Sequence, residues 1–238
     1  MIRSSYLAPS AVIAALSALS FHSEVQGQQQ ATHAIHLLKP QDYYGRRAFG
    51  SPGQAWLGVY ELNGTWEIRA SRIRVDTIPT PRGCAREVTK VSVDERQQPL
   101  FLIQGLQGLA QGPIEVPFVG RVFVEPGATL DFHLAPNHQY RLRAYGTRHG
   151  PPSDPTFAGY ELRLEHGTRS QLLAQLGVVE AGQPAAVLAG DLDRDHQLDL
   201  VLDLHRSYVG HRYTLFLSST AGPDSLVARV AELEVLGC

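Results

Sequence analysis

Four aspartates within nine residues are the strongest chemical signal in this 238-residue chain. Asp191, Asp193, Asp195 and Asp199 occupy positions 1, 3, 5 and 9 of one short segment. Carboxylates at this density repel one another unless a cation lies among them. Calcium accepts about six to eight oxygen ligands at flexible geometry, whereas magnesium prefers a stricter octahedron and zinc prefers His or Cys. The segment therefore predicts a calcium site, with the backbone carbonyl of Gln197 as a fifth ligand; a solvated acidic turn is the alternative.

The residues around the aspartates favour one kind of calcium loop. An EF-hand needs a bidentate carboxylate at position 12, where this chain has Leu202. The flanking residues 185–188 and 200–204 are patterned as strands rather than helices. With the words Gly190-Asp191-Leu192-Asp193 and Asp199-Leu200-Val201-Leu202, residues 185–218 resemble the FG-GAP and VCBS-type calcium loop, a strand-loop-strand unit of integrin-like β-propellers.

This resemblance implies a ligand set of four side chains and one carbonyl, from Asp191, Asp193, Asp195, Asp199 and Gln197. His196 stands where the family has Gly, at a position that usually needs a left-handed backbone. A propeller needs several blades, but no second Asp-x-Asp-x-Asp word occurs in the chain. A complete propeller is therefore not expected.

Catalytic motifs are absent from the sequence: we find no nucleophile elbow, zinc-protease helix, phosphate loop or paired-cysteine metal word. Asp203, His205 and His211 form the most reactive group. Asp203 and His205 are interpreted either as an acid-base or second-metal pair, or as the solvent face of an edge strand. Four large residues of the predicted hairpin also allow two interpretations. They form either a platform on which carbohydrate rings stack or part of the core: Trp56, Tyr60, Trp66 and Ile68.

Alternation of apolar and polar residues predicts an all-β fold. Residues 54–62 and 65–75 flank Asn63-Gly64, a strong hairpin signal. Further strands are predicted at residues 86–93, 100–104, 114–118, 121–124, 129–134, 140–145, 160–165, 213–218 and 226–236. We expect an antiparallel β-sandwich-like body (residues 28–180), with a C-terminal calcium-loop β-hairpin segment (residues 181–238) that packs on it or continues it.

The N-terminus predicts export. Residues 1–27 contain Arg3, a short apolar run and small residues before a cleavage point, as in a secretory signal peptide. The apolar run is too short to span a bilayer, so we expect a secreted or periplasmic protein with no membrane span after signal removal. A formal net charge of -2 with scattered signs gives no basic stripe and argues against a nucleic-acid partner.

Export permits a disulfide between the two cysteines, Cys84 and Cys238. Closing so long a loop would stabilise the fold by about 5 kcal/mol on the chain-entropy account. Two free thiols are the alternative interpretation.

Taken with the missing catalytic motifs, the acidic loop favours an exported non-catalytic β protein that binds calcium and works in binding, adhesion or envelope structure. Its partner would be a glycan or another exported protein. The alternative is a secreted, glycan-directed hydrolase in which calcium is structural.

Overall fold

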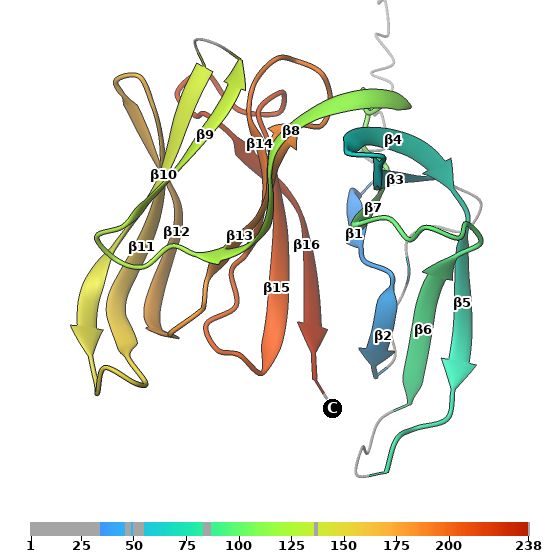
Figure 1. The fold of residues 1–238 in the computed structure, drawn as a ribbon, viewed down its shortest axis with the longest axis horizontal. Helices are drawn as coiled ribbons and strands as arrows, with labels where there is room; N and C mark the ends of the chain where they lie inside the picture. Colours follow the sequence, from blue (N-terminus) through green and yellow to red (C-terminus); the bar gives the residue numbers. More distant parts are fainter. Residues whose placement is uncertain (1–33, 46–48, 50–54, 83–86, 136–137, 238) are drawn as a thin grey trace, which may run out of the picture. The chain divides into compact units, whose positions relative to one another are not determined.

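The computed structural model describes residues 34–45, 49, 55–82, 87–135 and 138–237. These residues form antiparallel strands and no helix, which confirms the all-β prediction. The largest sheet has nine strands in the order β1-β7-β3-β4-β8-β13-β14-β15-β16 (Figure 1). Their bounds are β1 His36–Leu38, β7 Phe101–Gln104, β3 Trp56–Leu62, β4 Thr65–Ser71, β8 Gly112–Phe123, β13 Ala185–Asp191, β14 Asp199–Asp203, β15 Gly210–Leu217 and β16 Ala228–Leu236.

Two smaller sheets complete the described fold. A four-stranded sheet has the order β12 (Arg169–Glu180), β11 (Thr156–His166), β10 (His138–His149) and β9 (Thr129–Ala135). A three-stranded sheet has the order β2 (Gln41–Tyr44), β6 (Val88–Val93) and β5 (Ile73–Ile78). The edge strands β1 and β16 of the large sheet lie close together, so that this sheet is nearly closed.

The predicted Asn-Gly hairpin is confirmed. Trp56 pairs with Ser71 and Leu62 with Thr65, in the register of a two-residue turn. Asn63 and Gly64 have φ values of 52° and 82°, the left-handed conformations that a type I′ turn requires at both positions. Asn and Gly tolerate these conformations better than other residues, which is why this dipeptide fixes the register of β3 and β4.

Strand β8 joins the two halves of the large sheet. Its first residues pair with β4, as in Trp66 opposite Ile114, and its later residues pair with β13, as in Ala185 opposite Phe123. Figure 1 shows β8 arching from β4 to β13. The sheet therefore takes strands from both sides of the predicted boundary between residues 180 and 181, within the unit His33–Cys238.

Strands β13 and β14 lie at the centre of the core, because every residue in both is buried. On one face, Leu200 and Leu202 pack in a cluster with residues of the four-stranded sheet. On the other face, Leu188 and Val201 pack in a second cluster with β3, β7 and β15. Each fully buried side chain of this size contributes about 1.5–3 kcal/mol. The two apolar clusters therefore pack against both faces of β13 and β14 and hold the connection between these strands.

The structure corrects three sequence interpretations. Strand β14 lies between β13 and β15, and Asp203 is 0% exposed. The interpretation of Asp203 as part of the solvent face of an edge strand is therefore wrong. A stacking platform is wrong for Trp56 and Tyr60, which are core residues exposed by only 4% and 2%; Ile68 is equally buried. The strands predicted at residues 114–118 and 121–124 are one strand, β8, which ends at Phe123 and has a register shift against β13.

Other predictions fall on residues that the structure does not describe. The signal peptide of residues 1–27 and both Cys84 and Cys238 lie outside the described ranges, so export and the disulfide stay predictions. Within the described ranges, no helix has the length and apolar character needed to cross a membrane.

Candidate metal site

The acidic loop connects β13 to β14 and begins and ends on a paired residue. Gly190 pairs with Asp199 across the two strands. A side chain at Gly190 would meet the Glu115 carbonyl oxygen at 2.7 Å, so only glycine allows β8 to approach here. Leu192 and Leu198 are 1% and 0% exposed and anchor both ends of the loop in the core. The loop therefore leaves the sheet in a fixed direction.

Three of the four predicted carboxylates converge. One oxygen from each of Asp191, Asp193 and Asp195 lies within 4.8 Å of the others. Oxygen atoms at such separations can be brought onto one cation by small side-chain rotations, since calcium ligands lie about 2.3–2.6 Å from the ion. The described residues thus contain an aspartate triad that could hold a metal ion.

Backbone amides fix the first carboxylate of this triad. Asp191 is 4% exposed and accepts hydrogen bonds from the backbone N–H groups of Asp195 and His196, both at 3.0 Å. The pKa of Asp191 is raised, first because burial penalises its charge and also because Asp195 and Asp193 are negative. Each oxygen keeps a further lone pair, so these bonds leave room for a cation.

Asp193 is the member of the triad whose carboxylate has an oxygen without a hydrogen-bond donor. Its Oδ2 accepts a hydrogen bond from the Ser219 hydroxyl. Its Oδ1 is buried and has no hydrogen-bond partner. A buried oxygen without a donor costs roughly 1–3 kcal/mol, and more when it carries charge. A cation among the three carboxylates would remove this cost.

The loop turns through two residues in the left-handed region. Arg194 has φ 65° and His196 has φ 64°. His196 therefore adopts the left-handed backbone expected at its position, with its backbone N–H bonded to Asp191. The Arg194 side chain donates to the carbonyls of Ala110 and Gln111, in the segment directly before β8, and these bonds hold Arg194 in place.

Asp199 is not one of the three carboxylates that converge, and its described hydrogen bonds are to the Leu192 backbone and to Ser218. Its Oδ2 accepts from the Leu192 N–H at 2.8 Å, and its Oδ1 accepts from the N–H and hydroxyl of Ser218, both at 2.9 Å. Burial, followed by the negative charge of Asp193, raises the pKa of Asp199 to about 8. Asp199 thus ties the loop to the end of β15, and its role as a ligand stays a prediction.

Gln197, the predicted carbonyl ligand, is exposed. Its backbone N–H and its side-chain amide both contact the Asp195 carboxylate, at 2.8 and 3.4 Å. The Ser218 hydroxyl lies 2.9 Å from this carboxylate as well as from that of Asp199, and its one proton is donated to either of them at a time. These donors orient Asp195 toward the triad, while the role of the Gln197 carbonyl stays a prediction.

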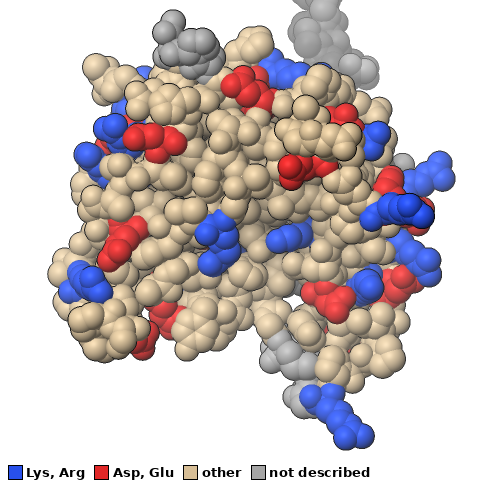
Figure 2. All heavy atoms as spheres, in the orientation of Figure 1, with Lys and Arg blue, Asp and Glu red and all other residues tan. Residues whose placement is uncertain are grey.

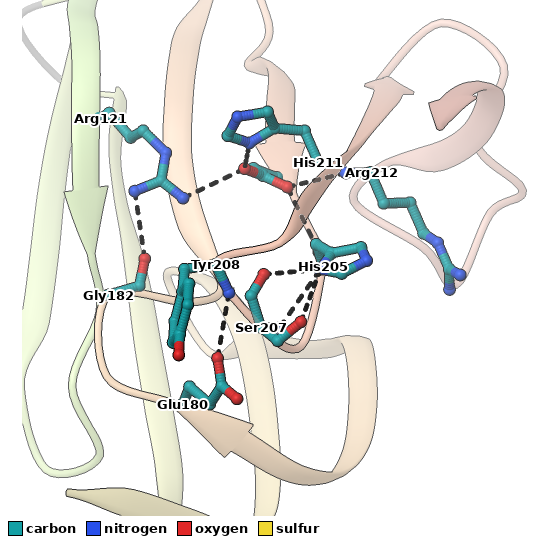
Figure 3. Close-up of polar contacts among 9 residues, drawn as sticks. Arg121, Glu180, Gly182, His205, Ser207, Tyr208, His211 and Arg212 are labelled. Atoms are coloured by element: carbon teal, nitrogen blue, oxygen red, sulfur yellow. Dashed lines mark hydrogen bonds and ion pairs between the residues drawn. The ribbon is translucent and has the colours of Figure 1, made fainter. Parts of the chain in front are cut away.

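A second polar cluster lies at the opposite end of β14 and is centred on Asp203. Arg121 and His211 lie 3.2 and 2.6 Å from one oxygen of the Asp203 carboxylate. In Figure 3 the Arg121 and His211 side chains point toward the same carboxylate. The other oxygen accepts from the backbone N–H groups of Arg212 and His205, at 2.9 and 3.3 Å. Burial alone would raise the pKa of Asp203, but these donors and the His211 ring lower it overall.

The predicted Asp203–His205 pair is therefore only a backbone contact. The His205 imidazole instead contacts Ser207, with its Nδ1 2.6 Å from the Ser207 carbonyl oxygen. Asp203 thus braces the segment between β14 and β15 from within the fold.

Sequence reasoning missed Ser218, Ser219 and Arg121, which complete the two clusters. Ser218 and Ser219 directly follow β15, and the register that places Phe216 opposite Leu200 brings them beside the loop. No short motif marks a hydroxyl that arrives through strand pairing. The visible surface gives no competing signal, because acidic and basic side chains are interspersed on the face shown in Figure 2.

Comparisons with known proteins add no relative to this description. No protein-family model, no curated protein and no solved structure matches the chain.

Proposed function

We propose that this chain is an exported, non-catalytic β protein that binds one calcium ion in the loop between β13 and β14. The single observation that supports the ion most strongly is the convergence of Asp191, Asp193 and Asp195 within 4.8 Å. The donor set supports calcium in particular, because all three side chains offer hard carboxylate oxygens and neither thiolate nor imidazole belongs to the triad. The FG-GAP and VCBS resemblance supports the same ion.

In this proposal the ion stabilises the fold rather than performing chemistry. The triad begins at the last residue of a fully buried strand, and the Ser218 and Ser219 hydroxyls connect it to the segment that follows β15. An ion in the loop would therefore fix two strand connections at once. Such a role suits a protein that works in binding, adhesion or envelope structure in the secreted or periplasmic space.

A hydrolase is less well supported by the contacts. Asp203, the best acid-base candidate of the sequence, is fully buried and receives four donors, so it is placed to support neighbouring residues rather than to contact a substrate.

Thermal unfolding with and without calcium tests the proposal. At calcium concentrations about 100-fold above the Kd, binding to the folded state adds about 2.7 kcal/mol. For a chain of this length we expect the melting temperature to rise by about 5–10 °C relative to a chelated sample. Equal concentrations of magnesium should give a smaller rise. A melting temperature that is the same in calcium and in chelator would refute the calcium site.

A further inference from the structure

Two of the three most exposed large apolar side chains of the described residues, Tyr208 and Val178, lie on either side of Glu180. Tyr208, Val209 and Val178 are 77%, 63% and 58% exposed, and no other large apolar side chain that is described exceeds 45%. Tyr208 and Val209 belong to the segment between β14 and β15, and Val178 is on β12. Exposed apolar groups that gather at one place mark binding surfaces more often than scattered ones do.

Val178 lines a pocket of about 340 Å³. Tyr208 lies next to this pocket, because it follows the lining residue Ser207 in the chain and its backbone N–H donates to the lining residue Glu180. This volume lies in the range of about 300–1,000 Å³ for small-ligand sites. The lining combines one apolar residue with hydroxyl, carboxylate, imidazole and guanidinium groups: Thr156, Val178, Glu180, His205, Arg206, Ser207 and Arg212. In Figure 3 the Tyr208 ring lies just above the Glu180 carboxylate and to the left of Ser207 and His205.

The segment that carries Tyr208 is held on both sides. The Tyr208 N–H donates to Glu180 Oε2 at 3.0 Å, and the Glu180 N–H donates to the Arg206 carbonyl at 2.9 Å. At its ends, the Leu204 N–H donates to the Arg212 carbonyl, and the Val209 carbonyl accepts from Gly237. Bonds at this density reduce the ordering cost of binding, because the backbone that carries the exposed ring is already held in place.

The buried Asp203 cluster explains how this segment keeps its shape. Asp203 accepts from the N–H groups of His205 and Arg212, the residues on either side of the exposed part. The His205 ring also packs against Gly210, where an added Cβ would lie 3.1 Å from its Nε2 and 2.8 Å from the Val235 carbonyl oxygen. The cluster therefore positions one wall of the pocket.

The charges that line the pocket are balanced. Arg212 is paired with Glu234 at 3.2 Å and lies 3.8 Å from Glu232. This leaves one carboxylate, Glu180, and one guanidinium, Arg206, which carry opposite charges. A strongly charged ligand would meet no excess of the opposite sign here. A neutral ligand rich in hydroxyl groups would find both donors and acceptors.

We propose that this pocket binds a neutral sugar unit of a glycan. A sugar ring presents hydroxyl groups at its edge, which suit Glu180, Arg206 and the Ser207 and Thr156 hydroxyls, and an apolar face, which suits the exposed ring of Tyr208. The inference rests on the proposed binding function and names its ligand class, but it is independent of the calcium ion, because no member of the aspartate triad lines the pocket.

Isothermal titration of the full mature chain tests this assignment. The probes are neutral oligosaccharides, namely cellotetraose, chitotetraose and maltotetraose, with glucuronate and inorganic phosphate as charged comparators. Each is added to about 10 mM, enough to detect a millimolar Kd. We expect at least one neutral oligosaccharide to bind and neither charged probe to compete. No binding of any neutral probe, or binding of a charged probe alone, overturns the proposal.

Two matched variants place the site. Tyr208→Ala should raise the Kd of the bound oligosaccharide by about threefold to tenfold, the range expected for loss of one aromatic contact. Tyr145→Ala removes an exposed tyrosine on β10, outside the pocket, and should leave the Kd unchanged. Both variants should melt like the parent protein, since both rings are exposed. An unchanged Kd in Tyr208→Ala overturns the assignment. Self-association of the parent protein that depends on its concentration and is abolished by Tyr208→Ala also overturns it, because the exposed ring would then contact a second copy of the chain.

Failure of this proposal is distinguishable from failure of the calcium site. The calcium site fails when a chelator leaves the melting temperature unchanged. The sugar site fails when the titrations show no neutral ligand.

Discussion

Replacing Asp199 with Asn should remove a pH dependence of stability that the ion-free loop imposes on the fold. Asp199 is 0% exposed, and burial together with the negative charge of Asp193 raises its pKa from 3.8 to about 8. The folded state therefore holds this proton more tightly than the unfolded chain does. Its contribution to stability is complete below pH 4 and is lost as the pH rises through about 8.

The magnitude follows from the two pKa values. At 1.36 kcal/mol per pH unit, the difference between 3.8 and about 8 corresponds to about 6 kcal/mol as an upper limit. In chelator, the free energy of unfolding of the parent protein should fall by several kcal/mol between pH 5 and pH 8. A cation in the triad favours the ionised carboxylate, so saturating calcium should cancel most of this fall.

Urea unfolding at pH 5 and pH 8 measures the effect in the parent protein and in Asp199→Asn. Other groups titrate in this window, so the informative quantity is the difference between the two proteins. The variant should be less stable at pH 5, because its amide group faces the Leu192 N–H, and should lose less stability by pH 8. The same loss of stability in both proteins would refute the reasoning about Asp199.

Two further substitutions test the framework around the two polar clusters. Asp203→Ala should lower the free energy of unfolding, measured in urea, by about 2–3 kcal/mol, because two backbone N–H groups lose a buried acceptor. The control Asp131→Ala breaks an exposed pair with Arg141 and should cost less than about 1 kcal/mol. Since the pKa of Asp203 is lowered, its contribution to folding stability should also be lost as the pH falls below 3.8. Equal losses of stability in Asp203→Ala and Asp131→Ala would contradict the bracing role of Asp203. Gly190→Ala should cost about 1–3 kcal/mol in thermal unfolding because its Cβ would meet a backbone oxygen at 2.7 Å; Gly177→Ala, with open space around it, should be nearly neutral, and a neutral Gly190→Ala would show that β8 can move away.

Local signals in the sequence predicted the local parts of the structure. Asn63-Gly64 predicts its hairpin because few other dipeptides tolerate two left-handed residues. The spacing of Asp191, Asp193 and Asp195 predicts their convergence, because a tight loop between two strands brings alternate side chains to one point. Both inferences need only neighbouring residues.

Features that depend on pairing between strands far apart in the chain could not be predicted from the sequence. Strand β14 looked like an edge because nothing local reveals that β15 pairs with it on one side and β13 on the other. Arg121 reaches Asp203 from 82 residues away, through the pairing of β8 with β13. Strand β12 was missed because its apolar residues do not alternate strictly and its register with β11 contains an irregularity.

The most direct test of the central claim is a calcium titration by isothermal calorimetry on the mature chain and on Asp193→Asn. The parent should bind one calcium ion per chain. The variant should bind far more weakly, because it loses the carboxylate whose buried Oδ1 has no other partner. Serine-hydroxyl contacts elsewhere in the loop do not depend on that charge, so the variant should still fold. No heat of binding in the parent, or equal binding in both proteins, would contradict a calcium site at this triad.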